Sequence, residues 1–354
     1  MSNVEPLVSV IVSVYNTGRY LEECLLSTIN QTMSNIEIIC VDDKSSDNSV
    51  CILDEYGKKD RRIKIIKHEN NCGLLKTRGD GVRAASGKYI LFLDSDDTLE
   101  LNACRDLSSM MDDTGCDIIQ FGTNVIPYEN ADSHLSRHYE LYLRPCVRTM
   151  IGDDIFKYQF SGMANWHVWN KIYKTDVCRK SYECAGDDYL ILTDDLYISF
   201  YNMYFSKKMK GTRKKYYNYN IGRGYTKNSN TEINRIRTIS CNSWFIYDCI
   251  DFLKKEGIFE KYGKYCFREP LLQMGVCVSM MKTIEDEKIR NEALQLIDDC
   301  WNREPFKDLL QKMISDDNWN SVLNRMKRHI SDYGLMETMK VMTHMTLFKI
   351  RKVI

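Results

Sequence analysis

The sequence predicts an α/β fold, with a mostly parallel sheet flanked by helices and followed by a helical C-terminal region. Three observations lead to this expectation. Short runs rich in Val and Ile alternate with segments of helical spacing over the first 125 residues. After Thr231 strand signals nearly vanish, and amphipathic stretches continue with breaks expected near Gly257, Gly263 and Pro305. The 354 residues, 44% of them hydrophobic, suffice for two domains with apolar cores.

Five apolar runs in the first part of the chain are expected to be strands. Each run is too short for a helix and has the composition of a buried strand. In chain order they cover residues 7–15, 36–41, 62–67, 89–93 and 117–122. A further strand is expected over residues 214–220.

Segments of helical spacing separate these strands. Residues 21–28 have one apolar face, and Thr17 could cap that helix. Ser45 or Ser46 could cap a second helix, and a third is expected over residues 74–85. Strand–helix–strand repetition builds a parallel sheet, whose ligands bind beyond the carboxyl ends of the strands. The residues that follow each strand are therefore the candidates for function.

Charge and composition exclude several classes of protein. The 49 basic and 49 acidic residues balance, which argues against a dedicated nucleic-acid binder. No run approaches the roughly 18 apolar residues of a membrane span, and the first residues lack the layout of a signal peptide. We therefore expect a cytoplasmic protein. Its basic and apolar stretch over residues 338–354 makes peripheral contact with the inner membrane surface a secondary expectation.

The 14 cysteines are scattered, and none forms a Cys-x-x-Cys pair. Many lie inside apolar runs, and a chain of this length needs no disulfides for stability. We expect free and mostly buried thiols that act as small hydrophobic side chains.

Acidic residues follow two of the expected strands. Asp42 and Asp43 follow the second strand, and the sequence DSDD at residues 94–97 follows the fourth. Neighbouring carboxylates repel unless a cation, a proton or a donor-rich ligand lies among them, and hard oxygen ligands suit Mg²⁺ or Mn²⁺. Taken alone, the second cluster also fits a polar turn in which Asp97 caps a helix at Leu99.

The order of these segments resembles the start of a glycosyltransferase of family 2. Residues 8–32, 41–49 and 69–97 carry the resemblance most densely, and it returns at residues 193–205. The resemblance implies the GT-A fold and sugar transfer with inversion of configuration. Within the family, the sequence most resembles bacterial enzymes that build cell-surface polysaccharides.

The resemblance also implies a nucleotide site in the first half of the chain. One of the two acids after the second strand would bond the base, commonly uracil. Asp94 and Asp96 match the Asp-x-Asp motif, which touches the ribose and the Mn²⁺ or Mg²⁺ ion on the diphosphate, with Asp97 as a supporting carboxylate. Arg78 would face the nucleotide, although Thr77 and Gly79 depart from the family's usual Ala and Asn. The residues expected at the nucleotide are Val14, Tyr15, Asn16, Asp42, Asp43, Arg78, Asp94, Ser95 and Arg223.

A pair of acids that opens a helix carries the catalytic base in this family. Here the pair is Asp194 and Asp195, after the capping residue Thr193, and Asp195 aligns with the base. A carboxylate within reach of the acceptor hydroxyl takes its proton, which is worth roughly 10²–10⁴ in rate. Asp194 stands in place of the usual Glu. Taken alone, the two acids could instead be N-terminal helix residues whose charge interacts favourably with the helix dipole.

Acceptor contacts are expected from the aromatic stretch over residues 166–173. Trp166 or Trp169 could form the floor of the acceptor site, and core packing is the alternative for both. Arg223 lies where the family often has a loop over the diphosphate. The basic run over residues 207–215 is expected at a solvated edge or against an anionic acceptor.

Together these expectations describe a metal-dependent inverting glycosyltransferase. Its donor would be a nucleotide diphosphate sugar, commonly UDP-linked, and its acceptor a saccharide or a lipid-linked hydroxyl. Residues 1–125 would form the nucleotide-sugar half of the GT-A domain, residues 126–230 its acceptor half, and residues 231–354 a helical region suited to a homodimer contact. A nucleotidyltransferase and a non-catalytic partner that binds nucleotide sugar stay open as alternatives.

Overall fold

The computed structural model divides into two compact units. The first contains Met1–Gln159 and Met163–Gly224, and the second contains Phe160–Gly162 and Tyr225–Ile354. The residues that the structure describes are 5–127, 133–160, 165–190, 193–223, 232–241, 244–266 and 268–315. The first unit is an α/β unit on one sheet, and the described part of the second is helical.

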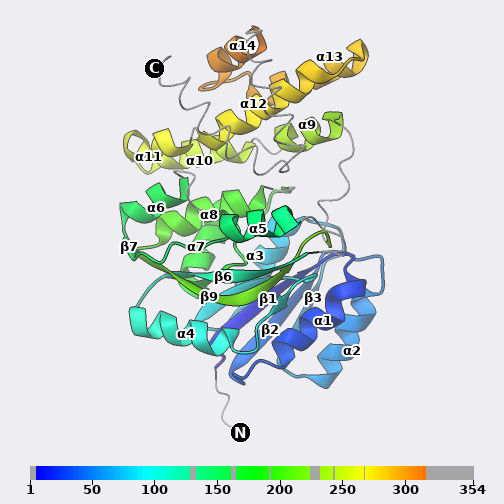
Figure 1. Ribbon diagram of the computed structural model, residues 1–354, viewed down its shortest axis with the longest axis vertical. Helices are drawn as coiled ribbons and strands as arrows, with labels where there is room; N and C mark the ends of the chain where they lie inside the picture. Colours follow the sequence, from blue (N-terminus) through cyan, green and yellow to red (C-terminus); the bar gives the residue numbers. More distant parts are fainter. Residues whose placement is uncertain are drawn as a thin grey trace. The chain divides into compact units, whose positions relative to one another are not determined.

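A nine-stranded sheet forms the centre of the first unit (Figure 1). Its strands are β1 (Val8–Val14), β2 (Ile36–Asp42), β3 (Ile63–Lys67), β4 (Tyr89–Asp94), β5 (Thr98–Leu99), β6 (Ile118–Ile126), β7 (Met150–Ile151), β8 (Lys171–Lys174) and β9 (Lys208–Asn220). The order is β3-β2-β1-β4-β8-β6-β9-β5, and β7 pairs with β9. The first four strands are parallel, as predicted. The sheet as a whole is mixed, because β8 runs antiparallel to both β4 and β6.

Helices cover the parallel strands on both faces. The chain steps in one direction from β1 to β2 to β3, and then returns across the sheet to β4. Right-handed crossovers therefore place α1 (Gly18–Ile29) and α2 (Ser49–Lys59) on one face and α3 (Leu74–Ala84) on the other, as Figure 1 shows. Every residue of β1 and β2 is buried, which is why both read as continuous apolar runs.

Several predicted helix starts are wrong. The second helix begins at Ser49 and is not capped by Ser45 or Ser46, because those residues hydrogen-bond to the loop at Asn16. Leu99 belongs to β5, so Asp97 caps no helix there. The remaining helices of the first unit are α4 (Ala103–Thr114), α5 (Ser133–Tyr142), α6 (Asp153–Phe160), α7 (Thr175–Ala185) and α8 (Asp194–Phe205).

The described residues of the second unit, between 232 and 315, are helical as predicted. Its helices are α9 (Glu232–Cys241), α10 (Trp244–Lys255), α11 (Phe259–Cys266), α12 (Arg268–Thr283), α13 (Glu287–Trp301) and α14 (Lys307–Ser315). Gly257, at φ +69°, separates α10 from α11, and Pro305 lies between α13 and α14. The break predicted at Gly263 is wrong, since this residue lies inside α11. The basic stretch over residues 338–354 lies outside the described residues.

Two further expectations concern the whole chain. Twelve cysteines are free thiols, and seven of them are buried, namely Cys24, Cys40, Cys104, Cys116, Cys178, Cys249 and Cys277. Within the described ranges, no helix combines the length and the apolar character that a bilayer span requires.

Candidate active site

The sheet places its candidate site at the carboxyl ends of β1, β2 and β4. Ser13 of β1 lies opposite Asp94 of β4, and Val14 lies opposite Asp42 of β2. Neighbouring strands are about 4.8 Å apart, so these two acids end strands about 10 Å from each other, on either side of β1. Because β2 and β4 flank β1 on opposite sides, this point is a topological switch, where open α/β sheets bind their ligands.

The acidic turn after β4 is fastened to β9 by one of its carboxylates. A hydrogen bond of 3.0 Å from the Asp97 N–H to the Asp94 carbonyl closes the turn. Asp97 is buried, and its carboxylate accepts hydrogen bonds from the Tyr217 hydroxyl (3.0 Å) and from the Asn220 N–H (2.7 Å). Asp97 therefore positions the turn and does not face an open site.

Asp94 and Asp96 are the half-buried members of this turn. Burial, followed by the charge of Asp94, raises the pKa of Asp96 to about 6. Among the described residues, no side chain donates a hydrogen bond to the Asp96 carboxylate. The Asp96 carboxylate and the neighbouring Asp94 offer hard oxygen donors, which suit a divalent cation such as Mn²⁺ or Mg²⁺. The donor set thus fits the expected metal.

A buried arginine gathers three acids from two distant segments. Arg78 of α3 is 2% exposed, and its Nη1 donates to Asp194 Oδ2 and to Asp195 Oδ1, each at 2.6 Å. Its Nη2 donates to Asp94 Oδ1 at 2.8 Å. The structure therefore brings together the acids after β4 and the acids that open α8. Contact of Arg78 with a nucleotide stays a prediction, and its side chain is enclosed by these partners.

The three carboxylates around Arg78 differ in their proton affinity. Burial outweighs the nearby guanidinium at Asp194 and raises its pKa to about 7. Burial opposes ionisation at Asp195 as well, but Arg78 and His167 together lower the pKa of Asp195. Because both acids bond to Arg78, they do more than complement the dipole of α8. Thr193 occupies the cap position as predicted, although its side chain makes no capping bond.

The departures from the family pattern next to Arg78 have a local explanation. A Cβ atom at Gly79 would lie 3.1 Å from the ring of Tyr182 and 3.3 Å from the guanidinium of Arg83, so a larger residue would be crowded. The Thr77 hydroxyl donates to the Gly73 carbonyl at 2.8 Å.

One residue of this cluster, His167, was missed by sequence reasoning. Its Nδ1 lies 3.2 Å from Asp195 Oδ2, and its side chain is 23% exposed. The only local signal was its place in the aromatic stretch over residues 166–173. Its contact with a residue 28 positions later depends on the tertiary fold.

The two tryptophans expected at the acceptor site have different surroundings. Trp169 is 3% exposed, stacks on Tyr217 with ring centroids 4.5 Å apart, and stacks on His167 at 4.8 Å. These contacts agree with the packing alternative for Trp169. Trp166 is half-buried, and its carbonyl accepts a hydrogen bond from the Ser199 hydroxyl at 2.7 Å. An acceptor contact stays a prediction, and Trp166 has more surface for it.

The loop after β1 is held by the loop after β2. Asn16 adopts a positive φ of 52°, its N–H donates to Ser45 Oγ at 3.0 Å, and its Oδ1 accepts from the Ser46 N–H at 2.8 Å. Tyr15 is 44% exposed, which leaves its ring open to a base. Ser95 is buried, and its hydroxyl accepts a hydrogen bond from Thr17 at 2.8 Å.

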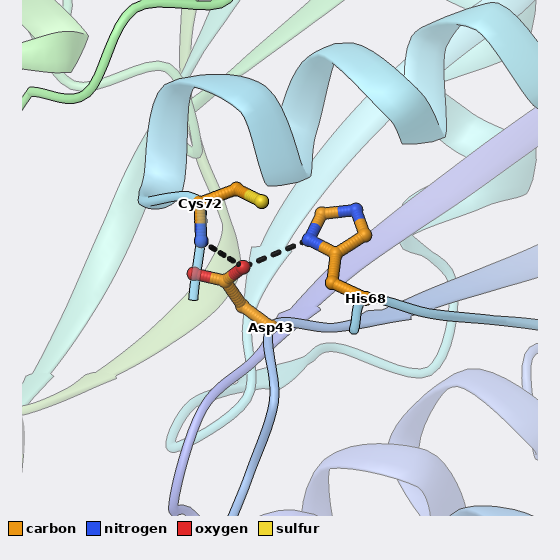
Figure 2. Close-up of side chains that lie close together, drawn as sticks. All are labelled: Asp43, His68 and Cys72. Atoms are coloured by element: carbon orange, nitrogen blue, oxygen red, sulfur yellow. Dashed lines mark hydrogen bonds and ion pairs between the residues drawn. The ribbon is translucent and has the colours of Figure 1, made fainter. Parts of the chain in front are cut away.

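The two acids after β2 have separate environments. Asp43 Oδ1 accepts from the Cys72 N–H (2.7 Å) and pairs with His68 Nδ1 (2.8 Å), as Figure 2 shows. Its Oδ2 accepts from the Gly73 N–H at 2.9 Å, so Asp43 anchors the start of α3. Asp42 Oδ2 accepts from a backbone N–H at 3.2 Å, and its buried Oδ1 has no partner among the described residues. Asp42 is therefore the acid with an acceptor atom to offer.

The side chains in Figure 2 also form a group with metal-ligand chemistry. The ligand atoms of Asp43, His68 and Cys72 all lie within 4.8 Å of one another. However, His68 Nε2 pairs with Asp80 Oδ2 at 2.9 Å while its Nδ1 pairs with Asp43. Both ring nitrogens are thus committed to carboxylates. We interpret the group as a hydrogen-bonded support for α3.

Arg223 lies near the acidic turn. Its Nη1 is 3.0 Å from Glu23 Oε2 and 3.5 Å from the Asp96 carbonyl oxygen. Its guanidinium lies over the ring of Tyr20, 4.8 Å from the centroid. A contact with phosphate stays a prediction, and the position beside Asp96 is suited to it.

The central sheet with helices on both faces has the GT-A type of fold, and comparisons with known proteins agree with this. Residues 9–181 match the family described as Glycosyl transferase family 2. EpsH of Bacillus subtilis is 34% identical over 221 residues, which are 61% of each chain, and glycosyltransferase GlyG of Streptococcus pneumoniae is 38% identical over 128 residues, 36% of this chain and 42% of its own. The similarity to glycosyltransferase family 2 thus covers residues 9–181, about half of the chain. The chain spans less than two thirds of these curated relatives.

Solved structures support the fold. The crystal structure of TarS 1–349 from S. aureus is similar with a TM-score of 0.54 and 17% identity, over 91% of both chains. The mannosyltransferase PcManGT from Pyrobaculum calidifontis has a TM-score of 0.51 and 13% identity, over 91% of this chain and 84% of its own. At these identities the likeness concerns the fold alone.

Proposed function

We propose that the protein is an inverting glycosyltransferase that moves a sugar from a nucleotide diphosphate donor to a hydroxyl acceptor. The observation that carries this proposal is the convergence of Asp94, Asp194 and Asp195 on Arg78 at the carboxyl ends of the strands. Such a transfer needs a charged site for the diphosphate next to a group that takes up a proton from an alcohol. The match of residues 9–181 to glycosyltransferase family 2 supports the same class of reaction.

We assign the metal site to Asp94 and Asp96. Both are half-buried, and the raised pKa of Asp96 reflects burial beside a like charge. A bound Mn²⁺ or Mg²⁺ would offset the negative charge that grows on the leaving diphosphate, a contribution of several kcal/mol. The similar mannosyltransferase was solved with GDP-Man and Mn²⁺, which supports this assignment.

We propose UDP as the nucleotide and Asp42 as the residue that reads its base. The free Oδ1 of Asp42 can accept a hydrogen bond from the N–H of a uracil, whereas the oxygens of Asp43 are engaged with α3. Tyr15, exposed at the end of β1, is the neighbouring aromatic side chain. Structures of TarS with UDP and with UDP-GlcNAc support a UDP-linked donor.

Asp42→Ala is expected to weaken UDP binding about 10- to 100-fold, because it removes a hydrogen bond to a charged acceptor. Isothermal titration calorimetry with UDP measures this change. Asp54→Ala is a matched control, because the side chain of this acid on α2 is 46% exposed and its ion pair within the described ranges is with Lys67. An affinity of Asp42→Ala within twofold of wild type would show that the base is recognised elsewhere.

Inversion requires the acceptor oxygen to attack the anomeric carbon in line with the departing diphosphate. As the new C–O bond forms, the old one breaks with its electron pair, and the hydroxyl proton must be taken up. We assign proton uptake to the part of the cluster around Asp195 and not to Asp194. The side chain of Asp195 is 20% exposed, whereas that of Asp194 is only 6% exposed. Asp194 then acts as a buried counter-charge to Arg78.

We propose a saccharide or lipid-linked hydroxyl of a cell-surface polysaccharide as the acceptor, used on the cytoplasmic side. A relative that is 46% identical over 93 residues, the poly(ribitol-phosphate) beta-glucosyltransferase of Bacillus spizizenii, supports this class. This match covers 25% of the chain and 15% of the relative.

Release of UDP from UDP-sugars in the presence of Mn²⁺ and saccharide acceptors tests the function. We expect the wild-type protein to release UDP in an acceptor-dependent way, and Asp195→Asn to do so about 10²–10⁴ times more slowly. Release of pyrophosphate from a nucleoside triphosphate would instead support a nucleotidyltransferase. UDP binding without turnover over a broad acceptor panel would support a non-catalytic partner.

A further inference from the structure

The imidazole of His167 is bonded to the acidic cluster at one nitrogen and open at the other. Nδ1 lies 3.2 Å from Asp195 Oδ2. No residue within the described ranges hydrogen-bonds to Nε2, and the side chain is 23% exposed. The ring is therefore bonded to the buried cluster, while part of the side chain stays accessible to solvent.

Aromatic contacts fix the orientation of this ring. Trp169 stacks on it with centroids 4.8 Å apart and planes 25° apart, and Tyr142 meets it edge-on at 5.6 Å and 89°. The His167 carbonyl accepts a hydrogen bond of 2.5 Å from Lys171 Nζ, which also bonds to Asn170 Oδ1 at 2.9 Å. A side chain held by packing and by its own backbone contacts is preorganised in the way that catalytic groups require.

Asp195, by contrast, has both carboxylate oxygens occupied. Oδ1 accepts from Arg78 Nη1 at 2.6 Å, and Oδ2 faces His167. Burial alone would favour the protonated acid, yet Arg78 and His167 lower the pKa of Asp195. A carboxylate with reduced proton affinity is a weak proton acceptor but a good partner for an imidazole N–H.

We propose that His167 takes up the proton of the acceptor hydroxyl at Nε2, while Asp195 accepts a hydrogen bond from Nδ1–H and holds the ring in that tautomer. The acceptor O–H bond breaks, its oxygen forms the bond to the anomeric carbon, and the bond to the diphosphate breaks with its electron pair. The proton then rests on Nε2 of an imidazolium that faces the charge of Asp195, and it passes to water after the product leaves. This inference rests on the proposed function and refines its assignment of the group that takes up the acceptor proton.

Two variants separate a catalytic role of His167 from a positioning role. His167→Asn retains an amide N–H near the position of Nδ1 that can donate to Asp195 but cannot take up a proton, and His167→Ala removes both properties. We expect both variants to transfer sugar about 10²–10⁴ times more slowly than wild type, with UDP affinity within twofold by calorimetry. We also expect added imidazole to restore part of the rate of His167→Ala.

The outcomes distinguish this inference from the proposed function. If His167→Asn binds UDP normally and keeps at least a third of the wild-type rate, the inference is overturned, and His167 only positions Asp195. If imidazole restores nothing to a folded His167→Ala that binds UDP, the inference is also overturned. A wild-type protein without acceptor-dependent UDP release overturns the proposed function, and this inference with it.

Discussion

Asp96→Asn is expected to lower sugar transfer by about two to four orders of magnitude while the protein stays folded. The change keeps the size of the side chain but removes one of the two half-buried carboxylates at the end of β4. Offsetting the charge of a departing diphosphate contributes several kcal/mol, and each 1.4 kcal/mol corresponds to a factor of ten. Steady-state UDP release at saturating donor and Mn²⁺ measures the loss.

Stability and a control variant make this result interpretable. Because burial and Asp94 disfavour the charge of Asp96, a neutral Asn should leave the free energy of unfolding unchanged or slightly higher. Asp113→Asn removes an exposed acid of α4 and should retain the wild-type rate. Wild-type turnover of Asp96→Asn would remove Asp96 from the proposed metal site.

Arg78→Met is expected to destabilise the protein by about 3–5 kcal/mol, because it leaves buried carboxylates without their cation. Arg78 is 2% exposed and bonds to Asp94, Asp194 and Asp195. Urea denaturation at pH 8 measures the free energy of unfolding. Transfer should also fall, since the acids after β4 and those that open α8 lose their common partner.

An arginine on the same helix provides the control. Arg83 pairs with Asp80 and Asp187 through a side chain that is 44% exposed, so Arg83→Met should cost at most about 1 kcal/mol. The pH dependence adds a second check. Without the guanidinium, the native-state pKa values of Asp194 and Asp195 are higher than in wild type. The variant therefore binds protons more strongly when folded, gains more stability than wild type as the pH falls, and its deficit shrinks. A deficit below 1 kcal/mol at pH 8 would contradict the proposed role of the cluster.

The parallel half of the sheet could be predicted from the sequence because β1, β2 and β4 are almost wholly buried, and the partly exposed β3 is a short Ile-rich run. The runs expected over residues 7–15, 36–41, 62–67 and 89–93 match β1 to β4 to within one residue at either end. Burial on both faces makes such strands continuous apolar runs that are easy to recognise. The reversed strand β8 was not predicted, because its four residues, KIYK, carry little local signal.

The polar contacts of the site could be predicted only in part. The acids after β4 and at the start of α8 stand out locally, since they follow an apolar strand or open a helix. Their convergence on Arg78 joins residues 116 and 117 positions apart, and no local pattern encodes such a distance. The same holds for His167. Ser45 and Ser46 were assigned to a helix cap because their side chains suit one, but the neighbouring loop at Asn16 competes for their hydrogen bonds.

A crystal structure of the protein with UDP and Mn²⁺ tests the whole arrangement at once. We predict that the ion is liganded by a carboxylate oxygen of Asp94 or Asp96, that the uracil meets Asp42, and that the Asp195–His167 pair faces the same cavity as the diphosphate. A nucleotide or metal bound away from the ends of β1 and β4, or a cavity from which the Asp195–His167 pair is closed off, would contradict the account.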